Sequence, residues 1–422
     1  MSPPRAAAFP APLLARARDR FDLTEPADQD RLYELAEELL AAPEISRETL
    51  RASASDAGVP LELKLAAKLV ESRRILTDLD TPLELGVVFA MWGEQQRLHP
   101  RSDDNPHGED LLRVKLRQLD WATRDTPIQW RLYAVDDGCP HGSGRIAREI
   151  AAGHPLRERV RISFLADALP AAAGPLAGLA SADDSRKGGA IIHGCSQALA
   201  EGVSAVIYTD ADNSVHLGQI GLLLEPHVLR GVRVVLGTRK DPHAVLVKQE
   251  ARWGVGIKLL RHMQRRIGQA IFARGIQDTQ AAFKLYERGI LERILEQPTV
   301  FDFSFDTDWL AAALAWDEPF ETVPFAFIDS FELSASIVQG PMTTWYALLT
   351  GLARAVRARG LPHDEDMAQV LDQEIHGAED LEQLIHHQPP QLENAEDADL
   401  GDAERMPAEA VRAWIRARKG TA

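Results

Sequence analysis

Apolar and polar positions follow two alternating patterns through the middle of the chain. Short apolar runs typical of strands are separated by stretches in which apolar residues recur at helical spacing. The runs expected to be strands are residues 85–90, 130–135, 160–165, 205–208 and 232–236. The helices expected around them are residues 109–123, 144–151, 188–200 and 250–274. This alternation predicts an α/β fold whose mainly parallel sheet is covered by helices on both faces.

The two ends of the chain follow other patterns. Residues 1–22 predict a flexible leader, and residues 29–78 carry apolar positions at helical spacing, which indicates a small helical arm. After about residue 360 the composition becomes rich in Glu, Asp, Gln and Ala, so we expect loosely attached helices with disorder between them. The expected organisation is therefore a leader and helical arm over 1–80, an α/β domain over 81–360 and an acidic, partly helical tail over 361–422.

Charge and cysteine content restrict the class of protein. The net charge is −16, but 14 acidic residues and no Lys or Arg lie between residues 364 and 404, which leaves the rest of the chain near −2. A nearly neutral body with an acidic tail is an unfavourable partner for nucleic acid. Only Cys139 and Cys195 are present and no apolar run approaches the ~20 residues of a membrane span, so we expect a cytoplasmic protein.

Two carboxylates follow the fourth expected strand, in the segment Tyr208-Thr209-Asp210-Ala211-Asp212. Carboxylates one residue apart at a strand end can share a hard divalent cation, and Mg²⁺ or Mn²⁺ keeps positions open for substrate phosphates. Asp212 is expected to be the direct metal ligand, with Asp210 nearer a ribose or a bound water. Such a cation would neutralise a leaving diphosphate, which favours chemistry on a nucleotide-activated donor.

Polar, Gly-rich segments also follow the other expected strands or open the helices after them. They are Met91-Trp92-Gly93-Glu94, Val135-Asp136-Asp137-Gly138, Arg186-Lys187-Gly188-Gly189 and Gly237-Thr238-Arg239-Lys240. Ligands of parallel sheets bind at the carboxyl ends of the strands, so these segments predict one site at one edge.

In the order and spacing of the motifs at residues 135–138, 187–189, 209–212 and 237–239 the chain resembles the family 2 glycosyltransferases of the GT-A fold, over roughly residues 83–335, whereas the segment at 91–94 departs from the family pattern. Two further matching segments are Asp278-Thr279-Gln280-Ala281-Ala282-Phe283-Lys284 and Phe305-Asp306-Thr307-Asp308. Within the family the closest resemblance is to the dolichyl- and polyprenyl-phosphate glucosyl- and mannosyltransferases. The resemblance implies a single mixed, mainly parallel sheet of GT-A type and an inverting, metal-dependent transfer of a hexose from a UDP- or GDP-sugar.

The resemblance also assigns roles to individual residues. Asp306 and Asp308 are the candidate catalytic carboxylates, and the metal is expected at Asp212 and Asp210. The residues expected around the donor are Ala90, Trp92, Glu94, Asp136, Asp137, Lys187, Asp210, Ala211, Arg239, Asp278 and Gln280. A carboxylate within hydrogen-bond reach can remove the proton of an acceptor hydroxyl, whereas an acceptor phosphate needs little or no base.

The acceptor stays open between a polyprenyl phosphate and a soluble small molecule or glycan. The polyprenyl-phosphate branch has a Gly-Ser-Lys segment after its last strand, and residues 331–336 contain no lysine. A basic amphipathic stretch from Arg252 to Arg266 indicates either a solvated helix face or a peripheral contact with a membrane or a phosphate. Homo-oligomerisation through the helical arm is a further possibility.

Two other functions compete with glycosyl transfer. A degenerate glycosyltransferase domain would serve as a binding platform, with partner contacts made by the helical ends. A sugar-phosphate nucleotidyltransferase would share the α/β architecture, but it requires a Gly-rich, Arg-containing signature after the first strand, and residues 91–97 do not supply one.

Overall fold

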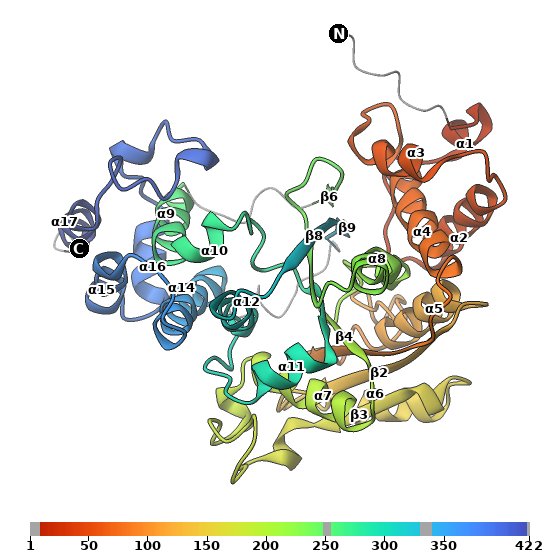
Figure 1. Cartoon of the computed structure of the whole chain (residues 1–422), viewed down its shortest axis with the longest axis horizontal. Helices are drawn as coiled ribbons and strands as arrows, with labels where there is room; N and C mark the ends of the chain where they lie inside the picture. The colour runs from red at the N-terminus through yellow and green to blue at the C-terminus, as the bar shows by residue number, and fades with distance from the viewer. Residues whose placement is uncertain (1–8, 248–254, 330–339, 420–422) are drawn as a thin grey trace.

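The computed structural model describes residues 9–247, 255–329 and 340–419. A seven-stranded sheet in the order β3-β2-β1-β4-β7-β5-β8 forms its centre. All neighbours in this sheet are parallel except β7, which runs antiparallel to both β4 and β5. The mixed, mainly parallel sheet flanked by helices is therefore confirmed (Figure 1).

The strands are apolar runs that the sheet buries. Their bounds are β1 Leu83–Met91, β2 Ile128–Asp136, β3 Val160–Phe164, β4 Ala205–Thr209, β5 Val234–Thr238, β6 Val245–Val247, β7 Phe283–Glu287, β8 Phe320–Pro324 and β9 Ala326–Ile328. Every residue of β4 and β5 is buried, as expected for strands covered on both faces. Strands β6 and β9 pair as a small separate sheet.

Helices cover both faces of the sheet, and further helices precede and follow the sheet domain in the chain. Their bounds are α1 Ala11–Arg16, α2 Pro26–Leu40, α3 Arg47–Ala52, α4 Leu61–Thr77, α5 Leu111–Thr123, α6 Ser143–Ala152, α7 Gly188–Ala200, α8 Ile220–Arg230, α9 Ile257–Ile267, α10 Gln269–Ala273, α11 Arg288–Leu295, α12 Phe305–Ala315, α14 Pro341–Ala358, α15 Glu365–Glu374, α16 Ala378–Ile385 and α17 Ala408–Lys419. One apolar core joins α2, α4, α5, α6 and α8 to the sheet, and another joins α7, α11, α12, α14 and the C-terminal helices to the opposite face.

The N-terminal helices are integrated with the sheet domain. Helix α4 packs so closely on α8 that a Cβ at Gly221 would lie 2.3 Å from the carbonyl oxygen of Ser72. The charged side chains of Lys68 and Glu71 are buried at this junction. Residues 61–77 therefore form a layer over the sheet, where the sequence predicted an arm.

The acidic C-terminal segment also differs from the expectation of loose attachment. Apolar side chains of α15, α16 and α17, such as Leu371, Leu381 and Ile415, are buried in the same core as α14. The acidic residues lie against the basic face of α9, where Arg265 pairs with Asp397 at 2.6 Å. The basic stretch thus contacts the acidic segment of its own chain (Figure 1, α9 beside the blue C-terminal helices).

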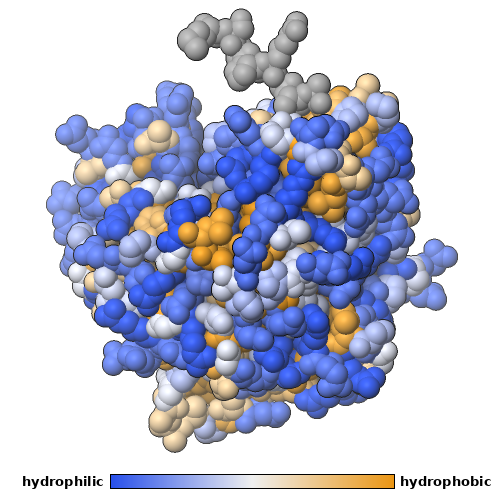
Figure 2. Space-filling view, turned by 45° about the vertical axis from the view of Figure 1, so that its right-hand side comes forward, coloured by the Kyte–Doolittle hydropathy of each residue, from blue (hydrophilic) through white to orange (hydrophobic). Residues whose placement is uncertain are grey.

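The single helix expected over residues 250–274 is two helices in the described part, α9 and α10, which meet at Gly268. The beginning of that stretch, including Arg252, and residues 331–336 lie outside the described residues. No helix of the described ranges is long and apolar enough to cross a bilayer. On the face drawn in Figure 2, polar side chains predominate and apolar ones form small separate groups.

Candidate active site

The carboxyl ends of β1, β2, β4 and β5 meet at one edge of the sheet. The register pairs Met91 with Asp136 at the ends of β1 and β2. Strand β7 runs the opposite way and pairs Phe283 with Thr209, so the loop before β7 reaches the same edge. This topology brings the segments at 91–94, 136–138, 209–213, 237–240 and 278–282 together, as the sequence predicted.

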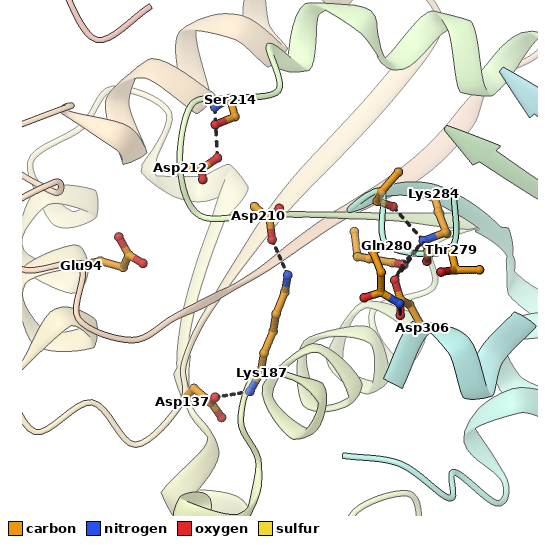
Figure 3. A network of polar contacts seen from close by, with 12 residues as sticks. Glu94, Asp137, Lys187, Asp210, Asp212, Ser214, Thr279, Gln280, Lys284 and Asp306 are labelled. Carbon is orange, nitrogen blue, oxygen red and sulfur yellow. Dashed lines mark hydrogen bonds and ion pairs between the residues drawn. The ribbon is translucent and has the colours of Figure 1, made fainter. Parts of the chain in front are cut away.

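Asp210 and Asp212 lie on the loop that follows β4 (Figure 3). The side chain of Lys187 forms an ion pair with Asp210. Burial by itself raises the pKa of Asp210, but the charge and hydrogen bond of Lys187 outweigh it and the pKa is lowered. Asp212 Oδ1 accepts a hydrogen bond of 3.1 Å from the backbone N–H of Ser214. The Asp210 carboxylate is thus held ionised by a lysine, while Asp212 is oriented by its own turn.

Helix α5 and the residues before it fix this acidic loop from the other side. Lys115 Nζ donates to the carbonyl oxygen of Asp212 at 2.7 Å, and Glu109 Oε2 accepts from the backbone N–H of Asn213 at 3.2 Å. Burial lowers the pKa of Lys115 to about 8. The loop that carries both candidate metal ligands therefore has its backbone bound at two successive residues.

Two buried carboxyl groups, those of Glu94 and Glu109, lie next to this loop. Glu94 is buried and paired with Arg97, and Glu109 Oε1 lies 3.9 Å from Arg97 Nη1 without a hydrogen-bond partner among the described residues. Burial raises the pKa of Glu94 and of Glu109 to about 7, and the charge of Asp212 adds to both shifts. The surroundings of Asp212 are therefore rich in buried oxygen atoms that a cation would stabilise.

The two aspartates after β2 have different surroundings. Asp136 accepts backbone hydrogen bonds from Cys139 and Gly144 at 2.9 and 2.7 Å, so both of its oxygens hold the turn and the start of α6. Asp137 Oδ2 accepts from the backbone N–H of Lys187 at 2.5 Å. Burial raises the pKa of Asp137 to about 7. Asp137 is thus the better candidate for contact with a base or ribose, and Asp136 supports the turn.

The turn before α7 places Lys187 between Asp137 and Asp210. Arg186 and Lys187 have φ values of 45° and 85°, which residues with a Cβ rarely adopt. Gly188 follows because a Cβ there would lie 2.5 Å from the backbone of Phe301. This strained backbone lets one lysine bind Asp137 through its N–H and Asp210 through its side chain, as Figure 3 shows.

Arg239 and Asp278 form a closed pair at the end of β5. The backbone N–H, Nε and Nη2 of Arg239 all donate to Asp278, at 2.8, 2.9 and 2.7 Å. Burial alone raises the pKa of Asp278, but Arg239 outweighs it and the pKa is lowered. Both residues lie at the predicted edge, where the sequence placed them around the donor, and the guanidinium is directed at the aspartate.

Asp306 is the centre of a second network, on the first turn of α12. Its oxygens accept from Gln280 Nε2 at 3.1 Å and from Lys284 Nζ at 3.0 Å. Lys284 is fully buried and also donates to Tyr208 and to the carbonyl oxygens of Thr279 and Ala281. Burial lowers the pKa of Lys284 against the opposing effect of Asp306. The network joins β4, β7 and α12 next to the acidic loop (Figure 3).

Asp308 lies elsewhere, although the sequence grouped it with Asp306. It is 0% exposed and accepts from the N–H and hydroxyl of Thr299, both at 2.8 Å. Its carboxylate is also paired with Arg359 at 3.0 Å. These contacts tie α12 to the end of α14, and we therefore assign Asp308 to the packing of these helices and not to catalysis.

The remaining predicted residues line the edge without polar roles of their own. Ala90 and Trp92 are half-buried near the end of β1, and the Trp92 ring lies 6.2 Å from that of His141 in an edge-to-face arrangement. Ala211 is buried between the two loop aspartates. The partly exposed indole is the aromatic surface available here to a flat base.

The sequence interpretation gave no role to Lys284, Lys115 or Glu109. A lysine inside the apolar run Ala281-Ala282-Phe283-Lys284-Leu285 was a usable signal, because a buried cation requires a buried partner. Lys115 and Glu109 carry no comparable signal, since each lies in or next to a helix in which charged residues are common.

Known proteins resemble this chain in sequence and in structure. No protein-family model matches the chain. The polyprenol monophosphomannose synthase of Mycolicibacterium smegmatis is 26% identical over 186 residues, which cover 43% of this chain and 62% of that protein. The match thus spans less than two thirds of the curated relative.

Two solved structures superpose on part of this chain. Glucosyl-3-phosphoglycerate synthase from Mycobacterium tuberculosis superposes on 70% of this chain and 85% of its own, with 13% identity and a TM-score of 0.45. Mannosyl-3-phosphoglycerate synthase from Rubrobacter xylanophilus superposes on 69% of this chain and 80% of its own, with 14% identity and a TM-score of 0.44. The sequence match to the mannose synthase confirms the resemblance of this chain to the family 2 glycosyltransferases of the GT-A fold.

Proposed function

We propose that this protein is a metal-dependent, inverting glycosyltransferase that moves a hexose from a UDP- or GDP-sugar to an acceptor. One observation carries the proposal. Asp137, Lys187 and Asp210 form a continuous chain of contacts at the edge of the sheet. The acidic loop at its end lies beside the Asp306 network, so a donor-type site and a candidate catalytic carboxylate adjoin.

In the proposed donor site, successive parts of the donor contact successive residues along this edge of the sheet. Asp137 accepts from the N–H groups of a base or from ribose hydroxyls, and Trp92 offers its ring face to the base. Lys187 supplies positive charge next to Asp210, and Arg239 with Asp278 closes the far side of the diphosphate region. Gln280 is placed to hydrogen-bond a sugar hydroxyl while it retains its contact with Asp306.

The residues present fit a hard divalent cation. Asp212 has one described hydrogen bond to its carboxylate, and the buried Glu109 Oε1 nearby has none. No described set of three or more His, Cys, Asp or Glu side chains is arranged to hold a metal. One or two carboxylates can bind Mg²⁺ or Mn²⁺ while donor phosphates and water complete the coordination. When bound, the cation would stabilise the negative charge of the leaving diphosphate.

In the proposed step an acceptor oxygen forms a bond to the anomeric carbon as the bond from that carbon to the diphosphate oxygen breaks. The electron pair of the broken bond leaves with the nucleoside diphosphate. A hydroxyl acceptor passes its proton to Asp306, whereas an ionised phosphate acceptor has no proton to lose. Lys284, Gln280 and Tyr208 hold the Asp306 carboxylate in place for either case.

The proposal leaves two classes of acceptor open. The name of the curated relative suggests a polyprenyl phosphate, which would require a peripheral contact with a membrane. A soluble small molecule or glycan suits a chain whose basic helix α9 is occupied by its own acidic segment.

The direct test is calorimetric titration of UDP and of GDP, each with and without Mn²⁺, into the wild-type protein and into Asp212→Asn. We expect Mn²⁺-dependent binding of one nucleotide, and at least a tenfold loss of affinity in the variant. Asp120→Asn on α5 is the matched control, because Asp120 is 44% exposed and its ion pair is with Arg124 at the far end of α5. Absence of nucleotide binding to folded wild-type protein would favour the non-catalytic binding platform.

A further inference from the structure

A cleft of about 640 Å³ lies beside the candidate active site, and most of its lining residues lie on α14 and α15, beyond the segments that resemble the glycosyltransferase family. Its walls come from the residue before Lys187, the segment before α12, and one face of α14 with α15. The lining residues are Arg186, Asp302, Phe303, Thr343, Tyr346, Ala347, Thr350, Arg354, Arg357 and Asp372. The volume lies in the range of small-molecule sites, and a few polar groups beside aromatic rings are typical of them.

Helix α14 supplies the longest wall through one face. The lining residues from Thr343 to Arg357 recur at intervals of three or four, so they lie on one side of the helix. The other side is buried in the core through residues such as Leu349 and Val356. The polar stripe is therefore held rigidly toward the cleft by the packing of the opposite face.

Two walls of the cleft also carry residues of the proposed active site. Arg186 directly precedes Lys187, and the backbone N–H of Gly189 donates to the carbonyl oxygen of Phe301 at 3.0 Å. Phe303 stands three residues before Asp306 on the same segment. A molecule in the cleft would therefore touch both the turn that binds Asp210 and the segment that begins α12.

The charges of the cleft leave one arginine uncompensated. Arg357 pairs with Glu365 at 3.0 Å and with Asp372 at 2.9 Å. Asp302 Oδ1 accepts from the N–H and hydroxyl of Ser304, so this oxygen points to the helix start. Arg354 is exposed and has no hydrogen bond or ion pair to any residue that the structure describes. A guanidinium in a cleft without an acidic partner is suited to bind a phosphate or carboxylate.

We propose that this cleft is the acceptor subsite, and that it selects a small hydroxylated acceptor by binding its anionic group, phosphate or carboxylate, at Arg354. This inference rests on the proposed function. Arg186 lines the same cleft, and the rings of Tyr346 and Phe303 flank the carbon skeleton of the acceptor. The acceptor is then held by helix α14, which lies beyond the family resemblance. The C-terminal part of this chain therefore determines which acceptor is bound.

The test uses three probes with one carbon skeleton: glycerol 3-phosphate, glycerate and glycerol. Each is titrated into the full-length protein, with and without Mn²⁺ and the nucleotide that binds in the titration above. The variants are Arg354→Gln and Arg354→Lys. Arg124→Gln is the control, because Arg124 is 56% exposed and follows α5 at the opposite edge of the sheet.

We expect one or both anionic probes to bind wild-type protein while glycerol does not, with at least a tenfold loss in Arg354→Gln and a smaller loss in Arg354→Lys. Binding of glycerol 3-phosphate alone, or of glycerate alone, identifies the anion. In transfer assays with a probe that binds, Arg354→Gln should raise KM about tenfold and leave kcat unchanged, because Arg354 does not contact the reacting atoms.

Three results would overturn the inference: neither anion binds, glycerol binds as well as the anions, or Arg354→Gln binds them as wild type does. Failure of the proposed function has a different signature, since it removes nucleotide binding in the first titration. The anion titrations without nucleotide are independent of that outcome.

Discussion

Replacing Asp137 by Asn should make the folded protein more stable above neutral pH. Asp137 is 6% exposed, and burial raises its pKa from 3.8 to about 7. A carboxyl whose pKa is raised by folding contributes stability below pH 3.8 and loses that contribution as the pH rises through 7. When Asp137 is fully ionised, this difference in pKa lowers the free energy of unfolding by about 4 kcal/mol, because a pKa difference of one corresponds to about 1.36 kcal/mol.

Asparagine removes the buried charge and retains an oxygen for the backbone N–H of Lys187. We therefore expect Asp137→Asn to raise the free energy of unfolding at pH 8 by about 2–4 kcal/mol and to show little gain near pH 4. The measurement is the urea midpoint of wild type and variant at intervals from pH 4 to pH 8. Asp183→Asn, an exposed acid in the segment before α7, is the control and should show no such trend.

The same variant should bind the nucleotide more weakly, so stability and binding should change in opposite directions. A variant that is less stable than wild type at pH 8 would refute the reasoning. So would a stability difference that stays constant from pH 4 to pH 8, since the effect depends on the ionisation of one buried carboxyl.

Three other predictions follow from the contacts of the site. Lys284→Met leaves the buried Asp306 carboxylate without its cation and should lower the free energy of unfolding by about 3–5 kcal/mol, with partial recovery in the double variant Lys284→Met/Asp306→Asn. Asp308→Asn should lower it by about 2–4 kcal/mol, measured by urea unfolding, while the kcat of the folded fraction stays near the wild-type value. Deletion of residues 361–422 should give an aggregating protein by light scattering, because it uncovers apolar side chains of α9 and α14; a monomeric, folded product would contradict the packing of α15–α17.

The parallel part of the sheet could be predicted because its strands are buried on both faces and read as continuous apolar runs. Strand β7 was not predicted, since its run contains Lys284 and its direction depends on which neighbours it pairs with. The division of residues 250–274 into two helices depends on Gly268. Patterns within one segment therefore predicted elements well and their partners less well.

The acidic C-terminal segment shows why composition was an incomplete guide. Its acidic residues predicted disorder, yet Asp397 and Asp364 pair with Arg265 and Arg266 of α9, far back in the sequence. Charge counted along the chain cannot show a partner more than 90 residues away. Apolar side chains such as Leu371 and Leu384 are buried and attach the segment to the core, but an average composition does not reveal their positions.

The site was predicted best where motifs follow strands. Asp137, Lys187, Asp210 and Asp212 were predicted together because the carboxyl ends of parallel strands share one edge. Asp306 and Asp308 were not distinguished, although residues two apart on a helix point to different sides. Once α12 begins at Phe305, only one of them can face the sheet edge, and the structure places Asp306 there.

The buried carboxyls at this edge bear on the choice between an enzyme and a binding platform. Glu94, Glu109 and Asp137 all have a pKa raised to about 7 by burial, and all three lie where the strands end. Each therefore costs folding free energy at neutral pH. Substitution by an uncharged residue would remove that cost, although Glu109 and Asp137 also accept the backbone hydrogen bonds that hold the acidic loop and the turn before α7. A bound cation and the N–H groups of a nucleotide base would stabilise these carboxylates, and that compensation favours the glycosyltransferase over the platform.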